Sequence, residues 1–352
     1  MKYSFRIGAI WGIPIELHIT FILLMAGIFI IAFPDFYSFS LVLFLFIFVL
    51  THELTHSLVA KHYNIRVRKI VLYPIGGVSE IEEIPDNPRV EWRMAIAGPL
   101  SSFAVGALLL AVDRIITIEG PAVPGFLVAR NLLYSLGILN LVLGAFNLVP
   151  AFPMDGGRVF RALLAEHTSF SDATKYAAFI GKILGIAMVV LGFIYNYWLI
   201  VVGFFVYIGA TEEAESTIVS TTMARVRVGD VMYPEIGAVA PEATMTDAIE
   251  AMFRSRYHDI LVEKDGVLRG VIAWTDIVKV DPTRRSQQSV GELPMKMVRV
   301  FADESVLEAY KTMNREKVDL VPVVDRGETQ KVVGVITNES ISYALEKAKA
   351  LR

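Results

Sequence analysis

The sequence predicts a multi-span α-helical membrane domain, with six transmembrane helices and a short β or re-entrant loop, followed by a soluble α+β module. Composition is the first indication, because 54% of the 352 residues are hydrophobic and only 20% are charged. The second is position, since the long apolar runs all lie before residue 211. The third is an internal repeat after that point, in a stretch whose polarity is typical of a soluble domain.

These changes in composition define the expected domains. A transmembrane domain spans residues 1–210, a polar linker spans 211–225, and the soluble module spans 226–352, with its two copies at 226–281 and 286–348. The module is mildly acidic and has no basic stripe, so nucleic-acid binding has no electrostatic support. No cleavage site of signal-peptide type follows the first apolar run, so we expect that run to be retained.

Six apolar segments are expected to cross the lipid bilayer. They are residues 17–33, 39–61, 94–116, 132–149, 176–193 and 197–210. Between the second and third segments, residues 64–88 alternate in polarity around Pro74, Gly76 and Gly77, which favours a hairpin or re-entrant loop over a further span. This loop either offers a strand edge to an extended substrate or is an ordinary surface hairpin.

The motif His52-Glu53-Leu54-Thr55-His56 lies at the end of the second apolar segment. A helix advances about 3.6 residues per turn, so the two histidines lie on one face and can bind one metal ion, as in the zinc-protease motif H-E-x-x-H. Glu53 is placed to accept a proton from a water molecule at such an ion. A chance match is the alternative, but ionisable groups in a membrane helix are costly and usually functional. The motif therefore predicts a hydrolytic metal site.

A third metal ligand is expected after the fourth span, because two imidazoles leave the ion short of protein ligands. Pro150 and Pro153 end the helix there, and the glycines at 156 and 157 allow a sharp turn, so Asp155 is presented at a broken helix end. A helix or turn cap is the alternative role for this aspartate. The chain contains no cysteine, so any zinc must use histidine and carboxylate ligands.

The distribution of positive charge predicts the orientation in the membrane. Six spans place both termini on one side of the membrane. The only positively charged residues of the segments on the opposite side are Arg114 and Arg130. The segments on the terminal side carry Lys2, Arg6, Lys61, Arg66, Arg68, Lys69, Arg89, Arg93, Arg158, Arg161 and Lys175. The positive-inside rule therefore predicts a multi-pass protein of the cell membrane with cytoplasmic termini. The second and fourth spans end on the same side, where the two motifs can meet.

The segments 52–56 and 147–156 together resemble the site-2 proteases, a family of intramembrane zinc metalloproteases. The likeness covers about residues 1–210, and it extends to three shorter landmarks. These are Gly12-Ile13-Pro14, Gly76-Gly77 and Ala97-Gly98-Pro99. Ser102 stands where many relatives have asparagine, which is a departure from the family pattern.

The resemblance implies one zinc ion per chain, bound by His52, His56 and Asp155, with Glu53 as the general base. It also implies that Asn147 assists at the substrate carbonyl; packing between helices is the alternative role for this residue. The expected substrate is a single-span membrane protein, whose helix must unwind locally before cleavage. The Gly76-Gly77 loop is expected to hold the unwound segment.

Residues 226–348 form the internal repeat, and each copy reads as strand, helix, strand, strand, helix. The matching segments are Val228-Gly-Asp230 with Val290-Gly-Glu292, Asp259-Ile-Leu-Val262 with Leu320-Val-Pro-Val323, and Gly270-Val-Ile272 with Gly334-Val-Ile336. The pair resembles tandem CBS domains. Such pairs bind adenine nucleotides such as ATP or AMP through a Thr or Ser followed three residues later by Asp.

Each copy keeps one residue of that nucleotide pattern. The first copy has Ala273 with Asp276, and the second has Thr337 with Ser340, so Asp276 and Thr337 are the candidate nucleotide-binding residues. The alternative is a homodimerisation or docking module without a ligand. In either case, a pair on the cytoplasmic side is expected to gate substrate entry.

Cleavage of transmembrane segments, as in regulated intramembrane proteolysis, is the expected function. A CBS-regulated metal-binding transporter and a proteolytically inactive relative are the alternatives. A transporter is expected to have repeated spans with ionisable residues at mid-membrane, and the sequence has no such repeat. The retained Glu53 argues against an inactive relative.

Overall fold

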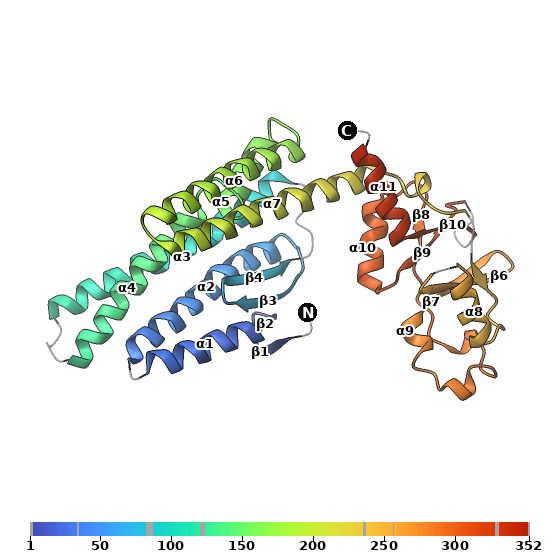
Figure 1. Ribbon diagram of the computed structural model, residues 1–352, viewed down its shortest axis with the longest axis horizontal. Helices are drawn as coiled ribbons and strands as arrows, with labels where there is room; N and C mark the ends of the chain where they lie inside the picture. Colours follow the sequence, from blue (N-terminus) through green and yellow to red (C-terminus); the bar gives the residue numbers. More distant parts are fainter. Residues whose placement is uncertain are drawn as a thin grey trace. The chain divides into compact units, whose positions relative to one another are not determined.

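The computed structural model describes residues 3–33, 35–81, 87–119, 124–234, 237–255, 257–327 and 331–350. The chain divides into two compact units, residues 1–215 and 216–352 (Figure 1). The division falls within helix α7 (Tyr197–Arg225), so residues 211–225, expected to be a linker, are helical. Lys2, one of the charges that predict the orientation, lies outside the described residues.

Helices form most of the first unit. They are α1 (Ile19–Ala32), α2 (Phe36–His62), α3 (Pro88–Glu119), α4 (Pro124–Asn147), α5 (Asp155–Ala165), α6 (Phe170–Ile194) and α7. Within the described ranges, α2, α3, α4, α6 and α7 are long and apolar enough to cross a membrane, which confirms the helical membrane domain. Helix α1 has only 14 residues. It is therefore about 21 Å long, short of the roughly 30 Å of a bilayer core.

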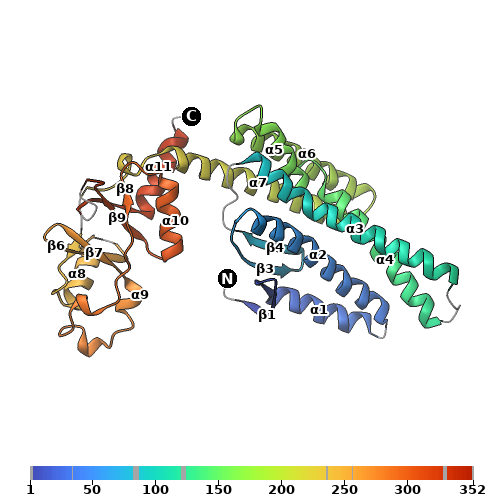
Figure 2. The same cartoon turned by 180° about the vertical axis from the view of Figure 1, so that it is seen from behind.

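A four-stranded sheet lies beside α2 in both views of the first unit (Figures 1 and 2). Its strands are β1 (Ser4–Ile10), β2 (Ile13–His18), β3 (Val67–Tyr73) and β4 (Gly76–Ile81), in that spatial order. Strands β2 and β3 are parallel, and α1 and α2 form the long connection that a parallel pair requires. The other two pairs are antiparallel hairpins. The predicted hairpin within 64–88 is confirmed as β3–β4, but the β1–β2 hairpin was not predicted.

The register of β3 and β4 determines which β4 side chains face α2. Ile70 is fully buried and packs with Leu54 of α2, so this face of β3 points toward the helix. Ser79 is the direct partner of Ile70 across the hairpin, and Gly77 precedes it by two residues. Alternate strand residues share a face, so Gly77 and Ser79 both face α2.

The second unit contains the two predicted copies, and this confirms the repeat. The first copy contains β5 (Ala238–Val239), α8 (Met245–Ser255), β6 (Asp259–Lys264), β7 (Val267–Ala273) and α9 (Trp274–Ile277). The second contains β8 (Val300–Phe301), α10 (Val306–Glu316), β9 (Leu320–Val324), β10 (Val332–Thr337) and α11 (Asn338–Ala350). Leu261 and Val271 of the first copy share one buried core with Val323 and Ile336 of the second, so the copies fold as one body.

Candidate active site

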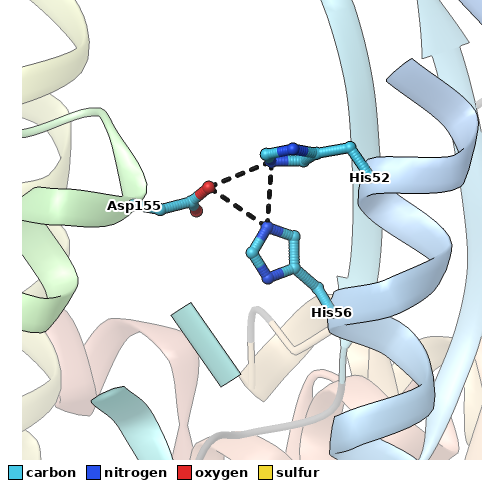
Figure 3. A group of neighbouring side chains, drawn as sticks. All are labelled: His52, His56 and Asp155. Atoms are coloured by element: carbon cyan, nitrogen blue, oxygen red, sulfur yellow. Dashed lines mark hydrogen bonds and ion pairs between the residues drawn. The ribbon is translucent and has the colours of Figure 1, made fainter. Parts of the chain in front are cut away.

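Three side chains from two helices of the first unit converge on one point (Figure 3). His52 and His56 lie one turn apart on α2, and Asp155 is the first residue of α5. The Nε2 atoms of His52 and His56 lie 3.0 and 3.1 Å from Asp155 Oδ2, and 3.1 Å from each other. The structure therefore brings together the two sequence motifs that were expected to meet.

The segment before α5 delivers Asp155 through a tightly packed turn. A Cβ atom added to Gly156 would lie 2.3 Å from the Val149 carbonyl oxygen, and one added to Gly157 would lie 2.6 Å from the Phe152 nitrogen. Side chains do not fit at either position, because real Cβ atoms do not approach backbone atoms so closely. Phe152 itself is fully buried between α6 and α7. The paired glycines therefore let the chain fold back so that α5 starts beside α2.

The donor atoms of these three residues fit a zinc ion. They form a nearly equilateral triangle whose corners lie about 1.8 Å from its centre, which is less than the zinc–ligand distance of about 2.0–2.1 Å. The spacing of His52 Nε2, His56 Nε2 and Asp155 Oδ2 would therefore allow all three atoms to hold one zinc ion. Three protein ligands are also the number that catalytic zinc sites use, because the fourth position stays open for a substrate or water.

The outer nitrogen of each histidine has a fixed partner. His56 Nδ1 donates a hydrogen bond to the Met94 carbonyl oxygen at 2.7 Å, which fixes the ring with Nε2 toward Asp155 and would leave Nε2 of the neutral ring free to bind a metal ion. His52 Nδ1 lies 2.9 Å from the hydroxyl of Ser102, which is buried. Serine at position 102 thus makes a polar contact with a candidate ligand, although it departs from the family pattern.

Gly98 of α3 lies against both candidate ligands. A Cβ atom at this position would lie 2.2 Å from His56 Nε2 and 2.6 Å from His52 Nε2. The backbone of α3 therefore forms one wall of the site, and a side chain at residue 98 would occupy the place of the ligand atoms.

Strand β4 lies over Glu53, the residue between the two histidines. Glu53 Oε2 accepts a hydrogen bond from the Ser79 hydroxyl at 2.8 Å, and a Cβ atom on Gly77 would lie 2.5 Å from Glu53 Cγ. Sequence reasoning identified Gly76 and Gly77 but missed Ser79. The available signal was strand alternation, since residues 77 and 79 of a strand point the same way.

Asn147 is the last residue of α4, and its side chain is half-buried. Its Nδ2 donates a hydrogen bond to the Leu143 carbonyl oxygen at 3.0 Å, one turn earlier in the same helix. This contact ties the side chain to its own helix, so the predicted role of Asn147 at the substrate carbonyl stays a prediction.

A buried ion cluster holds α5, the helix that begins with Asp155. Arg161 of α5 donates hydrogen bonds to Glu91 of α3 and to Glu213 of α7. Its guanidinium lies between two aromatic rings, 4.9 Å from the centre of Phe152 and 4.7 Å from that of Phe170. Sequence reasoning counted Arg161 among the charges that decide orientation. In the structure Arg161 is 5% exposed and forms a buried ion pair with Glu91, a partner that the sequence did not indicate.

The candidate nucleotide residues of the second unit have local partners. Asp276 Oδ1 accepts a hydrogen bond from Lys279 Nζ at 2.7 Å. Thr337 is buried, its hydroxyl oxygen accepts from the Ser340 nitrogen at 3.2 Å, and this contact caps the start of α11. Nucleotide binding by Asp276 and Thr337 stays a prediction.

Burial raises the pKa of the Asp259 carboxyl in the first copy, and this carboxyl accepts a hydrogen bond from the Asp319 nitrogen of the second copy.

Comparison with known proteins places both units in known families. Residues 40–124 and 115–191 match the sequence profile of peptidase family M50, and residues 228–282 and 290–347 match that of the CBS domain. A zinc metalloprotease of Methanocaldococcus jannaschii is 39% identical over 348 residues, which are 98% of this chain and 97% of that protein. A solved structure of a site-2 protease from the same organism is 46% identical, covers 60% of this chain and 95% of its own, and has a TM-score of 0.46. The match to the metalloprotease thus extends over both units.

Proposed function

The chain belongs to peptidase family M50 as an intramembrane zinc protease with a C-terminal pair of CBS domains, and we propose that it cleaves single-span membrane proteins within their transmembrane segment. The observation that carries this proposal is the convergence of His52, His56 and Asp155, with Glu53 beside them in a helix that is apolar enough to cross a membrane.

His52, His56 and Asp155 are the residues that hold the zinc ion in this proposal. Bound zinc supplies Lewis-acid chemistry, which activates water and polarises the scissile carbonyl group. Glu53 accepts a proton from the attacking water and then donates it to the leaving amine. Asn147 donates a hydrogen bond to the substrate carbonyl oxygen from the end of α4.

The substrate binds as an extended strand along β4, at the end that starts with Gly76 and Gly77. In the described part of the sheet β4 is an edge strand, so one row of its backbone groups is available to another chain. A helical substrate satisfies its own backbone hydrogen bonds, so it must first unwind. Strand addition replaces the hydrogen bonds that unwinding breaks, and Gly77 leaves room for the backbone close to Glu53.

Both termini lie in the cytoplasm in this proposal, as the distribution of positive charge indicates. This orientation requires the 14-residue α1 to make the sixth crossing, for which the bilayer must thin around it. The chain has no cysteine, so single cysteines introduced at Lys175 and at Arg114 report on opposite sides of the membrane. In right-side-out vesicles, a membrane-impermeant thiol reagent should label position 114 and leave position 175 unlabelled. The opposite labelling pattern contradicts the proposed orientation.

The CBS pair binds an adenine nucleotide, ATP or AMP, and gates the protease in this proposal. Asp276 of the first copy contacts the ribose, and Thr337 of the second copy also binds the nucleotide. Titration of the full chain with ATP and AMP tests this, and Thr337→Val should weaken binding about threefold to tenfold by removing one hydrogen bond to the nucleotide. If neither nucleotide binds to the full chain, the pair acts as a homodimerisation or docking module.

The proteolysis assay uses purified full-length protein and a single-span substrate in detergent. Wild type should cleave the substrate within its membrane segment, and chelation of the metal should stop cleavage. Glu53→Gln should retain one zinc per chain but lose activity by at least 100-fold, because the amide cannot accept the proton. Stoichiometric metal without cleavage by wild type would favour a metal-binding transporter or an inactive relative.

A further inference from the structure

We propose that Ser79 is a positioning residue, which acts through Glu53 and couples the edge strand of the sheet to the general base. The inference rests on the proposed function. It is carried by a chain of three side chains in the first unit, Ser57, Ser79 and Glu53, that joins α2 to β4.

The hydrogen bonds in this chain run in one direction. The Ser57 hydroxyl donates to Ser79 Oγ at 3.2 Å, and the Ser79 hydroxyl donates to Glu53 Oε2 at 2.8 Å. An ionised carboxylate only accepts, so the Ser79 hydroxyl is the donor to Glu53 Oε2, and this contact is shorter than the 3.4 Å between Ser79 Oγ and the Glu53 backbone carbonyl oxygen. A donor fixed on Oε2 leaves Oε1 as the oxygen that accepts the proton of the attacking water.

The surroundings hold both serines in place. Ser57 is fully buried and lies one turn after Glu53, on the same face of α2. Ser79 is fixed by its pairing with Ile70, whose burial against α2 sets the register of the hairpin. A shift of β4 by one residue would turn Ser79 away from Glu53, because alternate strand residues face opposite sides.

This geometry links substrate binding to chemistry. The strand that offers its edge to the substrate is also the strand that orients the base. A substrate paired to β4 holds that strand, and with it Ser79, against Glu53. Loss of the Ser79 hydroxyl should therefore slow the chemical step while the strand edge, which binds substrate, stays intact.

The test compares Ser79→Thr with Ser79→Val, two side chains of the same shape that differ only in the hydroxyl and that both suit a strand. The kcat and KM for cleavage of the single-span substrate are measured, together with bound zinc. Ser79→Thr should keep kcat within about threefold of wild type. Ser79→Val should lower kcat by about 10–100-fold, the range of one hydrogen bond to a charged group, with KM and zinc content unchanged.

Ser4→Ala is the matched control. The Ser4 hydroxyl donates to the Glu16 carboxylate in the same sheet, so this variant removes the same kind of hydrogen bond away from Glu53. It should leave kcat at the wild-type value. Equal kcat for the Thr and Val variants, or a loss of kcat in Ser4→Ala as large as that in Ser79→Val, would overturn the role of Ser79. Either result would leave the proposed function standing. Absence of cleavage by the wild type would overturn the proposed function, and this inference with it.

Discussion

Substitution of Gly98 by alanine should destroy the metal site with little change elsewhere. The added Cβ would lie 2.2 Å from His56 Nε2 and 2.6 Å from His52 Nε2. A carbon–nitrogen contact needs about 3.4 Å, so the His56 ring must move by about 1 Å. The rings cannot swing away freely, because the Nδ1 atoms of His56 and His52 are held by the Met94 carbonyl and by Ser102.

The size of the effect follows from the displaced atoms. Loss of an outer partner of a metal ligand typically weakens metal binding by about 10–100-fold. Here the ligand atoms themselves are displaced, so we expect zinc affinity to fall by at least about 100-fold and cleavage to fall with it. Competition with a chelator of known affinity measures the change in the purified full-length protein.

Gly27→Ala is the matched control for this substitution. Gly27 lies in α1, and a Cβ atom there would meet nothing within 4 Å. This variant should bind zinc as wild type does. If Gly98→Ala binds zinc with wild-type affinity, the α3 backbone does not form a wall of the metal site. A Cβ atom at residue 98 then does not displace the two imidazole rings.

Three further predictions concern the base, the ion cluster and the second unit. Gly77→Ala should lower kcat at least tenfold with zinc retained, because its Cβ would lie 2.5 Å from Glu53 Cγ; unchanged kcat would argue against β4 lying over the base. Arg161→Leu leaves Glu91 buried without its salt-bridge partner and should lower the free energy of unfolding by about 3–5 kcal/mol, measured by denaturant titration in detergent; a loss below about 1 kcal/mol would contradict the buried pair. Burial raises the pKa of the Asp259 carboxyl in the native state, so its contribution to stability is present below the unfolded pKa and is lost as pH rises through the native pKa. The Tm of wild type should therefore fall relative to Asp259→Asn as pH rises above about 4, and a constant difference in Tm would refute the raised pKa.

Those parts of the fold that depend on local pattern could be predicted from the sequence. Long apolar runs predicted the membrane helices, the spacing of His52 and His56 predicted their shared helix face, and the repeat predicted the two copies of the second unit. Each of these signals lies within about 60 residues of chain. Asp155 lies about 100 residues after the two histidines, so helix spacing cannot relate it to them. It was predicted from the prolines and glycines around it and from the family resemblance.

The remaining features depend on contacts between distant segments. Strand β1 is exposed along nearly its whole length, so its pairing with β2, rather than a buried face, holds it as a strand. Ser79 meets Glu53 only because the register with Ile70 turns it toward α2. The sequence does not indicate which residue pairs with Arg161, because its buried partner Glu91 is 70 residues away.

Zinc K-edge X-ray absorption on the purified full-length protein identifies the atoms bound to the metal, and therefore tests whether His52, His56 and Asp155 hold zinc. We predict one zinc per chain with two imidazole ligands and the remaining ligands oxygen at about 2.0–2.1 Å. The two-imidazole pattern should remain in Glu53→Gln, which does not cleave, and should be lost in His52→Ala. A spectrum without imidazole scattering, or one that is unchanged in His52→Ala, would contradict the assignment of His52, His56 and Asp155 as the zinc site.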